Sequence, residues 1–149
     1  CGFWPKEVLD YFSRALDFAD AAAREHPGID WLYTGHSLGA QLAELVAAVR
    51  GSTALVFSTP AVKKILRNRT EVDPDTIPVG RAMALFDEWD PIRYEGLGQV
   101  PGFSCLWDTA PPPRGCKHCD LHSHGDLHKL DPACGLCFKQ THIFKHYAQ

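Results

Sequence analysis

The sequence lacks a long apolar run, an excess of basic residues and internal repeats, and these absences exclude several classes of protein. No stretch of about 18 apolar residues occurs, so no membrane-spanning helix is predicted. The formal net charge is −3 at pH 7 and no stripe of Lys and Arg is present, which argues against a nucleic-acid partner. With 149 residues, 45% of them hydrophobic and 22% charged, the chain suits one globular domain.

The beginning of the chain lacks both a start methionine and the apolar segment of a signal peptide. It opens at Cys1 and enters helix-like sequence at once, so we expect a piece of a longer precursor. Six cysteines and the N-glycosylation sequon at Asn68–Thr70 both favour an oxidising compartment. These features predict a glycosylated protein that is secreted or resides in the vacuolar or endomembrane lumen.

Apolar patterning predicts alternating helices and strands. The expected elements are a helix that begins near Pro5 and stops at His26–Gly28, strands over 29–34, 53–59 and 81–86, and helices over 38–49 and 60–68. Strand, helix, strand, helix, strand is typical of an α/β fold with a mostly parallel sheet. Residues from about 96 to 137 are rich in Gly, Pro, His and Cys without a clear period, which predicts a packed loop.

The segment "TGHSLG" carries the chemical signal, because it places G-x-S-x-G between a predicted strand and a predicted helix. In a sharp strand-to-helix turn, Ser37 would be exposed as a nucleophile, and the Leu38 N–H would face the oxyanion. Small residues at Gly35 and Gly39 are expected to prevent clashes in this turn. A glycine-rich turn with an incidental serine is the alternative, and the flanking elements favour the nucleophile.

A serine nucleophile needs a base and an acid, which follow it along the chain as Asp or Glu and then His in α/β-hydrolases. Asp90 is favoured as the acid because it precedes Pro91 just after the last predicted strand, and Asp87 is the alternative. Among eight histidines, His36 is too close in sequence to reach Ser37, and those of the loop suit solvent or metal. His142 and His146 remain as candidates for the base.

The segment "TGHSLGAQLA" resembles the nucleophile elbow of the class 3 (fungal-type triacylglycerol) lipases. "VFSTP", "DEWDPI" and "THIFKHY" resemble the later strand, aspartate and histidine segments of that family, with the autophagic vacuolar lipase-like members as the nearest subgroup. The resemblance implies a partial α/β-hydrolase fold over residues 1–149, incomplete at its N-terminus, with the Cys-rich loop as an insertion. It also implies a triad of Ser37, Asp90 and His142, with His146 as the second choice for the base.

The function implied by this resemblance is serine-dependent hydrolysis of lipid esters through an acyl-enzyme, without a metal or organic cofactor. The expected partner is a lipid or other ester, met at a membrane or lipid-droplet surface. A second oxyanion donor and a lid are expected from an upstream segment that would associate with this chain. The alternatives are a catalytically incompetent lipase-like binding or structural protein, and a phospholipase or a feruloyl- or cutin-type esterase.

The cysteine loop has two interpretations. Cys116, Cys119, Cys134 and Cys137 follow C-x2-C-x14-C-x2-C, a spacing close to that of zinc ribbons. The sequon, the two further cysteines and the lipase resemblance favour disulfides instead. Six cysteines allow 15 pairings, so the connectivity stays open.

Overall fold

The computed structural model describes residues 10–87, 90, 92–107 and 142. Its helices are α1 (Tyr11–Glu25), α2 (Leu38–Arg50), α3 (Lys63–Arg69) and α4 (Arg93–Gly96), and its strands are β1 (Leu32–His36), β2 (Thr53–Phe57), β3 (Ala82–Asp87) and β4 (Phe103–Trp107). Two short 3₁₀ turns, η1 (Pro74–Thr76) and η2 (Val79–Arg81), lie between α3 and β3. Helices and strands therefore alternate, as the sequence predicts.

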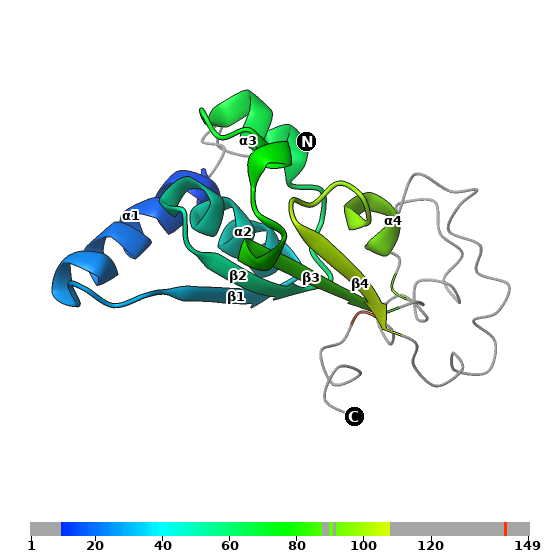
Figure 1. The fold of residues 1–149 in the computed structure, drawn as a ribbon, viewed down its shortest axis with the longest axis horizontal. Helices are drawn as coiled ribbons and strands as arrows, with labels where there is room; N and C mark the ends of the chain where they lie inside the picture. Colours follow the sequence, from blue (N-terminus) through cyan, green and yellow to red (C-terminus); the bar gives the residue numbers. More distant parts are fainter. Residues whose placement is uncertain (1–9, 88–89, 91, 108–141, 143–149) are drawn as a thin grey trace, which may run out of the picture.

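The strands form one four-stranded sheet in the order β1-β2-β3-β4, and every neighbouring pair is parallel (Figure 1). Helix α2 packs across β1 and β2, and α1 packs against α2. The chain thus has an α/β fold with an all-parallel sheet flanked by helices. Because parallel strands end at the same edge, the residues that follow β1, β2 and β3 gather there.

One face of the sheet carries the core. Alternate residues of β2 and β3 are fully or almost fully buried there, and they pack with apolar residues of the helices. This core contains Phe12, Ala40, Leu45, Ala54, Val56, Val62, Leu66, Ala84 and Phe86, with others. Small alanines in α2 and the strands allow the helix to lie close to the sheet, so the end of β1 and the start of α2 are held rigidly.

The beginning of α1 is fixed by polar contacts with α3. Asp10 caps α1 by accepting a hydrogen bond from the Ser13 N–H at 3.2 Å. The Arg69 guanidinium pairs with the same carboxylate and lies over the Phe12 ring, 5.6 Å from its centroid. The Arg69 contact is the main reason that the pKa of Asp10 falls below its ordinary value, followed by the contacts of Ser13. These contacts place the start of α1 beside the end of α3.

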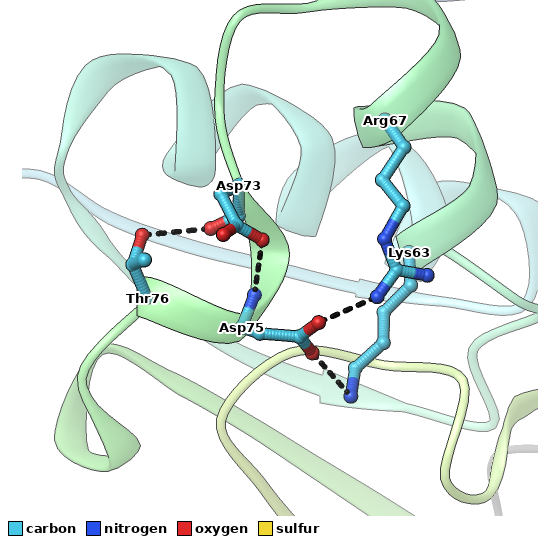
Figure 2. Close-up of polar contacts among 5 residues, drawn as sticks. All are labelled: Lys63, Arg67, Asp73, Asp75 and Thr76. Carbon is cyan, nitrogen blue, oxygen red and sulfur yellow. Dashed lines mark hydrogen bonds and ion pairs between the residues drawn. The ribbon is translucent and has the colours of Figure 1, made fainter.

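A polar cluster orders the turn-rich link between α3 and β3 (Figure 2). Asp75 pairs with Lys63 at 3.1 Å and with Arg67 at 2.6 Å, both on α3. The Asp75 N–H donates to the Asp73 side chain at 3.0 Å, and the Thr76 hydroxyl donates to the Asp73 carbonyl at 2.8 Å. Exposed ion pairs contribute little to stability, so this cluster chiefly sets the path of the link.

The structure differs from the sequence prediction at two strands. The first strand was expected over 29–34, but β1 spans Leu32–His36, because Gly35 and His36 still pair with β2. The last strand, β4, was not predicted, and Phe103–Trp107 was assigned to the loop over 96–137. It adds to the edge of β3 as a parallel strand. Among the described helices, none has the length and apolar character required to cross a membrane.

Candidate active site

Ser37 occupies the turn between β1 and α2 in an unusual backbone conformation. Its φ is 57° and its ψ is −127°, in a region that residues with a side chain rarely adopt. The Ser37 N–H donates to the Phe57 carbonyl at 3.1 Å, and its carbonyl accepts from Gln41 at 3.1 Å. The side chain makes no capping hydrogen bond to α2. The backbone is thus held on both sides while the hydroxyl stays free of the helix.

The two glycines around Ser37 are not equivalent. A Cβ atom on Gly35 would lie 2.4 Å from the Gly39 carbonyl carbon and oxygen and 2.7 Å from the Ala40 nitrogen. Apart from Gly39 itself, its two chain neighbours and the nearby α2 backbone, no described atom lies within 4 Å of a Cβ atom placed on Gly39. The expectation that both glycines prevent clashes is therefore wrong for Gly39. Only Gly35 is required for the close approach of β1 to the first turn of α2.

The first turn of α2 supplies oriented donors beside Ser37. N–H groups in the first turn of a helix have no intrahelical acceptor, and the helix dipole makes this end partially positive. The Leu38 N–H is the first of these groups, because α2 begins at Leu38, and its role as an oxyanion donor stays a prediction. Its side chain is 48% exposed, so the region in front of Leu38 is accessible.

Asp90 and His142 lie in direct contact, although they are 52 residues apart. His142 Nδ1 is 2.9 Å from Asp90 Oδ2. Asp90 is fully buried, its Oδ1 accepts the Ile92 N–H at 2.9 Å, and its Oδ2 also accepts the Ser58 hydroxyl. The carboxylate is thus oriented by three partners, and the imidazole is bound through the nitrogen that an acid of a triad would hold.

The His142 ring also contacts His36, the residue that precedes Ser37. The two ring centroids are 4.6 Å apart, with an angle of 40° between the planes. Burial is the main cause that lowers the pKa of His36, and the charge of His142 acts in the same direction. Asp90 and a backbone hydrogen bond with His142 act in the opposite direction. This contact brings the Asp90–His142 pair to the end of β1.

The structure does not join all three predicted triad residues by hydrogen bonds. Asp90 contacts His142, and His142 contacts His36, but in the described part of the chain no hydrogen bond joins the Ser37 hydroxyl to His142. Nucleophile–base hydrogen bonds are often long before substrate binds.

Asp87, the alternative acid, is also buried, and its carbonyl accepts the Asp90 N–H at 3.1 Å.

Two buried polar side chains near this edge were not singled out from the sequence. Glu44 on α2 is 1% exposed, and burial raises its pKa to about 8. Its Oε2 lies 3.3 Å from the Thr59 hydroxyl, and its Oε1 has no hydrogen-bond partner among the described residues. Ser58, between Phe57 and Thr59, is fully buried and donates to Asp90. The sequence indicated their burial only by placing a polar residue inside an apolar segment, at "AELV" for Glu44 and at "VFSTP" for Ser58.

A cavity of about 400 Å³ lies between the starts of α1 and α2 and the α3 helix. It is lined by Leu38, Leu42 and Leu45 of α2, by Tyr11 and Phe12 of α1, and by Ile65, with Asp10, Gln41 and Arg69 as its polar members. Since Leu38 directly follows Ser37, this mostly apolar space is close along the chain to the candidate nucleophile. It has the volume of a small-ligand site.

Several predicted features lie outside the described residues. These are His146 and the four cysteines with zinc-ribbon spacing, Cys116, Cys119, Cys134 and Cys137. Cys105 lies in β4 and its sulfur forms no disulfide. Asn68, the residue of the predicted glycosylation site, is exposed on α3. In the described ranges, no group of three or more His, Cys, Asp or Glu side chains gathers as a metal site would require.

Comparison with protein-family models finds none that matches this chain, and comparison with curated proteins finds no matching relative. The resemblance to class 3 lipases therefore depends on the short motifs around Ser37, Asp90 and His142.

Proposed function

We propose that this chain carries the nucleophile of a serine-dependent carboxylic ester hydrolase. The observation that carries the proposal is the positive φ of Ser37, in a tight strand-to-helix turn at the edge where Asp90 and His142 pair. Strained residues of this kind cluster at active sites, where the surrounding structure stabilises the unfavourable conformation that holds a reactive group in place. A helix cap would not need this conformation, and Ser37 makes no capping hydrogen bond.

In the proposed reaction, His142 accepts the proton of the Ser37 hydroxyl as the oxygen attacks the ester carbonyl carbon. The Leu38 N–H stabilises the negative charge that develops on the carbonyl oxygen. The tetrahedral intermediate then expels the alcohol, which takes the proton from His142, and an acyl-enzyme remains. Water, deprotonated by His142, releases the acid and restores Ser37, while Asp90 keeps the imidazole oriented.

Lipid esters, with triacylglycerols as the first candidate, are the proposed substrates. The cavity beside Leu38 supports this choice, since six of its lining residues are apolar or aromatic and could accommodate an acyl group. The motif resemblance points to the same substrates and to a secreted or lumenal enzyme. A phospholipase or another esterase would use the same arrangement of Ser37, Asp90 and His142, and substrate comparison separates them.

The second candidate function is a lipase-like binding protein without catalysis. It is favoured by the absence of a hydrogen bond between Ser37 and His142 in the described part of the chain. Losing one oxyanion donor typically costs about 100- to 1,000-fold in rate. A protein in which the Leu38 N–H is the single oxyanion donor could therefore bind esters without hydrolysing them.

Hydrolysis of a short-chain p-nitrophenyl ester distinguishes the two functions. The enzyme interpretation expects release of p-nitrophenol that Ser37→Ala reduces to the rate without protein. Ser52→Ala, directly before β2, serves as the control and should keep the wild-type rate. Equal rates for wild type and Ser37→Ala would reject catalysis by Ser37.

A further inference from the structure

We propose that Ser58 is a positioning residue that fixes Asp90 against His142, an inference that rests on the proposed hydrolase function. Ser58 directly follows β2, and its hydroxyl donates to Asp90 Oδ2. The same oxygen faces His142 Nδ1 at 2.9 Å. The hydroxyl therefore acts on the very atom through which the carboxylate holds the imidazole.

The backbone at Ser58 indicates that the side chain is needed there. Ser58 and Ser37 are the two described residues other than glycine with positive φ, and Ser58 has a φ of 50°. Glycine adopts this conformation at no steric cost, whereas a residue with a Cβ atom is strained. Strain of this kind persists only where the surroundings impose it, and it clusters at functional sites. The two strained serines follow neighbouring strands at the same edge of the sheet.

The surroundings of Ser58 leave its hydroxyl little freedom. The residue is fully buried, and its N–H donates to the Leu85 carbonyl of β3 at 2.9 Å. Because β2 and β3 hold the backbone of Ser58, its hydroxyl is a rigid donor that can orient the Asp90 carboxylate. Asp90 lies in the turn after β3, so the contact links this turn to the end of β2.

Without the Ser58 hydroxyl, Asp90 Oδ2 would keep His142 as its partner while Oδ1 keeps the Ile92 N–H. The carboxylate could then rotate, and the imidazole with it. Misplacement of a catalytic group by about 1 Å can cost roughly 100-fold in rate. At metal sites, loss of a hydrogen bond that orients a ligand costs about 10- to 100-fold, which gives the scale for a positioning contact. The expected effect of removing this hydroxyl is a decrease of the same order.

Ser58→Gly is the informative variant, because glycine accepts the positive φ while the CH2OH side chain, and with it the hydroxyl donor, is removed. Ser52→Gly is the matched control, since Ser52 directly precedes the same strand and its contact is a backbone one, from its N–H to the Ala47 carbonyl at 2.9 Å. The probe is a fluorophosphonate, whose phosphorus is attacked by an activated serine with release of fluoride. We expect Ser58→Gly to be labelled about 10- to 100-fold more slowly than wild type, and Ser52→Gly at the wild-type rate.

Thermal unfolding separates positioning from folding. Ser58→Gly is expected to stay folded at the temperature of the labelling assay, because relief of the backbone strain opposes the free energy lost with the hydrogen bond to the buried Asp90. A stably folded Ser58→Gly that is labelled at the wild-type rate would overturn the inference and leave the proposed function intact. A wild-type protein that is not labelled at Ser37 would instead reject the proposed function.

Proton NMR of the His142 imidazole tests the role of Ser58 even if the wild-type protein is not labelled at Ser37. The proton shared by His142 and Asp90 is expected to give a low-field resonance in wild type and in Ser52→Gly. In Ser58→Gly we expect this resonance to move or to broaden through exchange with water. An unchanged resonance in Ser58→Gly, or its absence from the wild-type spectrum, would overturn the role of Ser58.

Discussion

Replacing the two glycines of the G-x-S-x-G segment, one at a time, tests the geometry of the turn. A Cβ atom at Gly35 would come within 2.4 Å of the Gly39 carbonyl and 2.7 Å of the Ala40 nitrogen. These are backbone atoms of α2, so the helix or the strand must move as a whole. We expect Gly35→Ala to lower the free energy of unfolding by about 3 kcal/mol or more, the upper range for overpacking.

Gly39→Ala is the matched control, since its Cβ atom would meet no described atom within 4 Å outside its chain neighbours and the nearby α2 backbone. Gly39 lies in the first turn of α2, where alanine stabilises the helix by up to about 1 kcal/mol relative to glycine. The two variants should therefore move the unfolding midpoint in opposite directions in urea titrations followed by circular dichroism. Equal stability of the two variants would refute the close approach of β1 to α2 at Gly35.

Three further predictions concern buried carboxyl groups. Burial raises the pKa of Glu44 from 4.5 to about 8, so between these values the unfolded chain is ionised while the folded protein holds a proton. The free energy of unfolding should then fall by about 3–5 kcal/mol from pH 4.5 to pH 8, and urea titrations of Glu44→Gln should show this dependence reduced. Asp90→Asn should lower kcat for ester hydrolysis by about 10,000-fold, since an acid that holds the imidazole is lost. Asp87→Asn should have a smaller effect in the same assay, and the reverse order would exchange the two assignments.

The layered part of the fold could be predicted because its signals are local. The segment that forms α2 combines helix formers with few polar residues, and in the structure Gly51 ends this helix in a left-handed conformation. The apolar run of β2 indicated a strand, although its lack of alternation is typical of a strand covered on both faces and the structure fully buries only alternate residues of β2. Strand β4 was missed because it follows Pro101 and Gly102 within a Cys- and Pro-rich region. Its pairing with β3 is a long-range contact that local composition does not reveal.

The candidate site was predictable where chain order and spacing carry the signal. The G-x-S-x-G spacing led to Ser37, and the Asp-Pro step led to Asp90, which lies against His142. The buried donor Ser58 could not be inferred, since nothing local indicates that it meets a carboxylate 32 residues further along the chain. The burial of Glu44 in α2 could not be predicted either, because a single polar residue in a helix usually lies on the solvent-exposed face.

Reaction of the wild-type protein with a fluorophosphonate, followed by peptide mapping, tests the central claim most directly. The account predicts that one serine is modified, that it is Ser37, and that Ser37→Ala abolishes the labelling while leaving the unfolding midpoint near that of wild type. Labelling at another serine, or no labelling of a folded protein, would contradict an activated hydroxyl at the turn between β1 and α2.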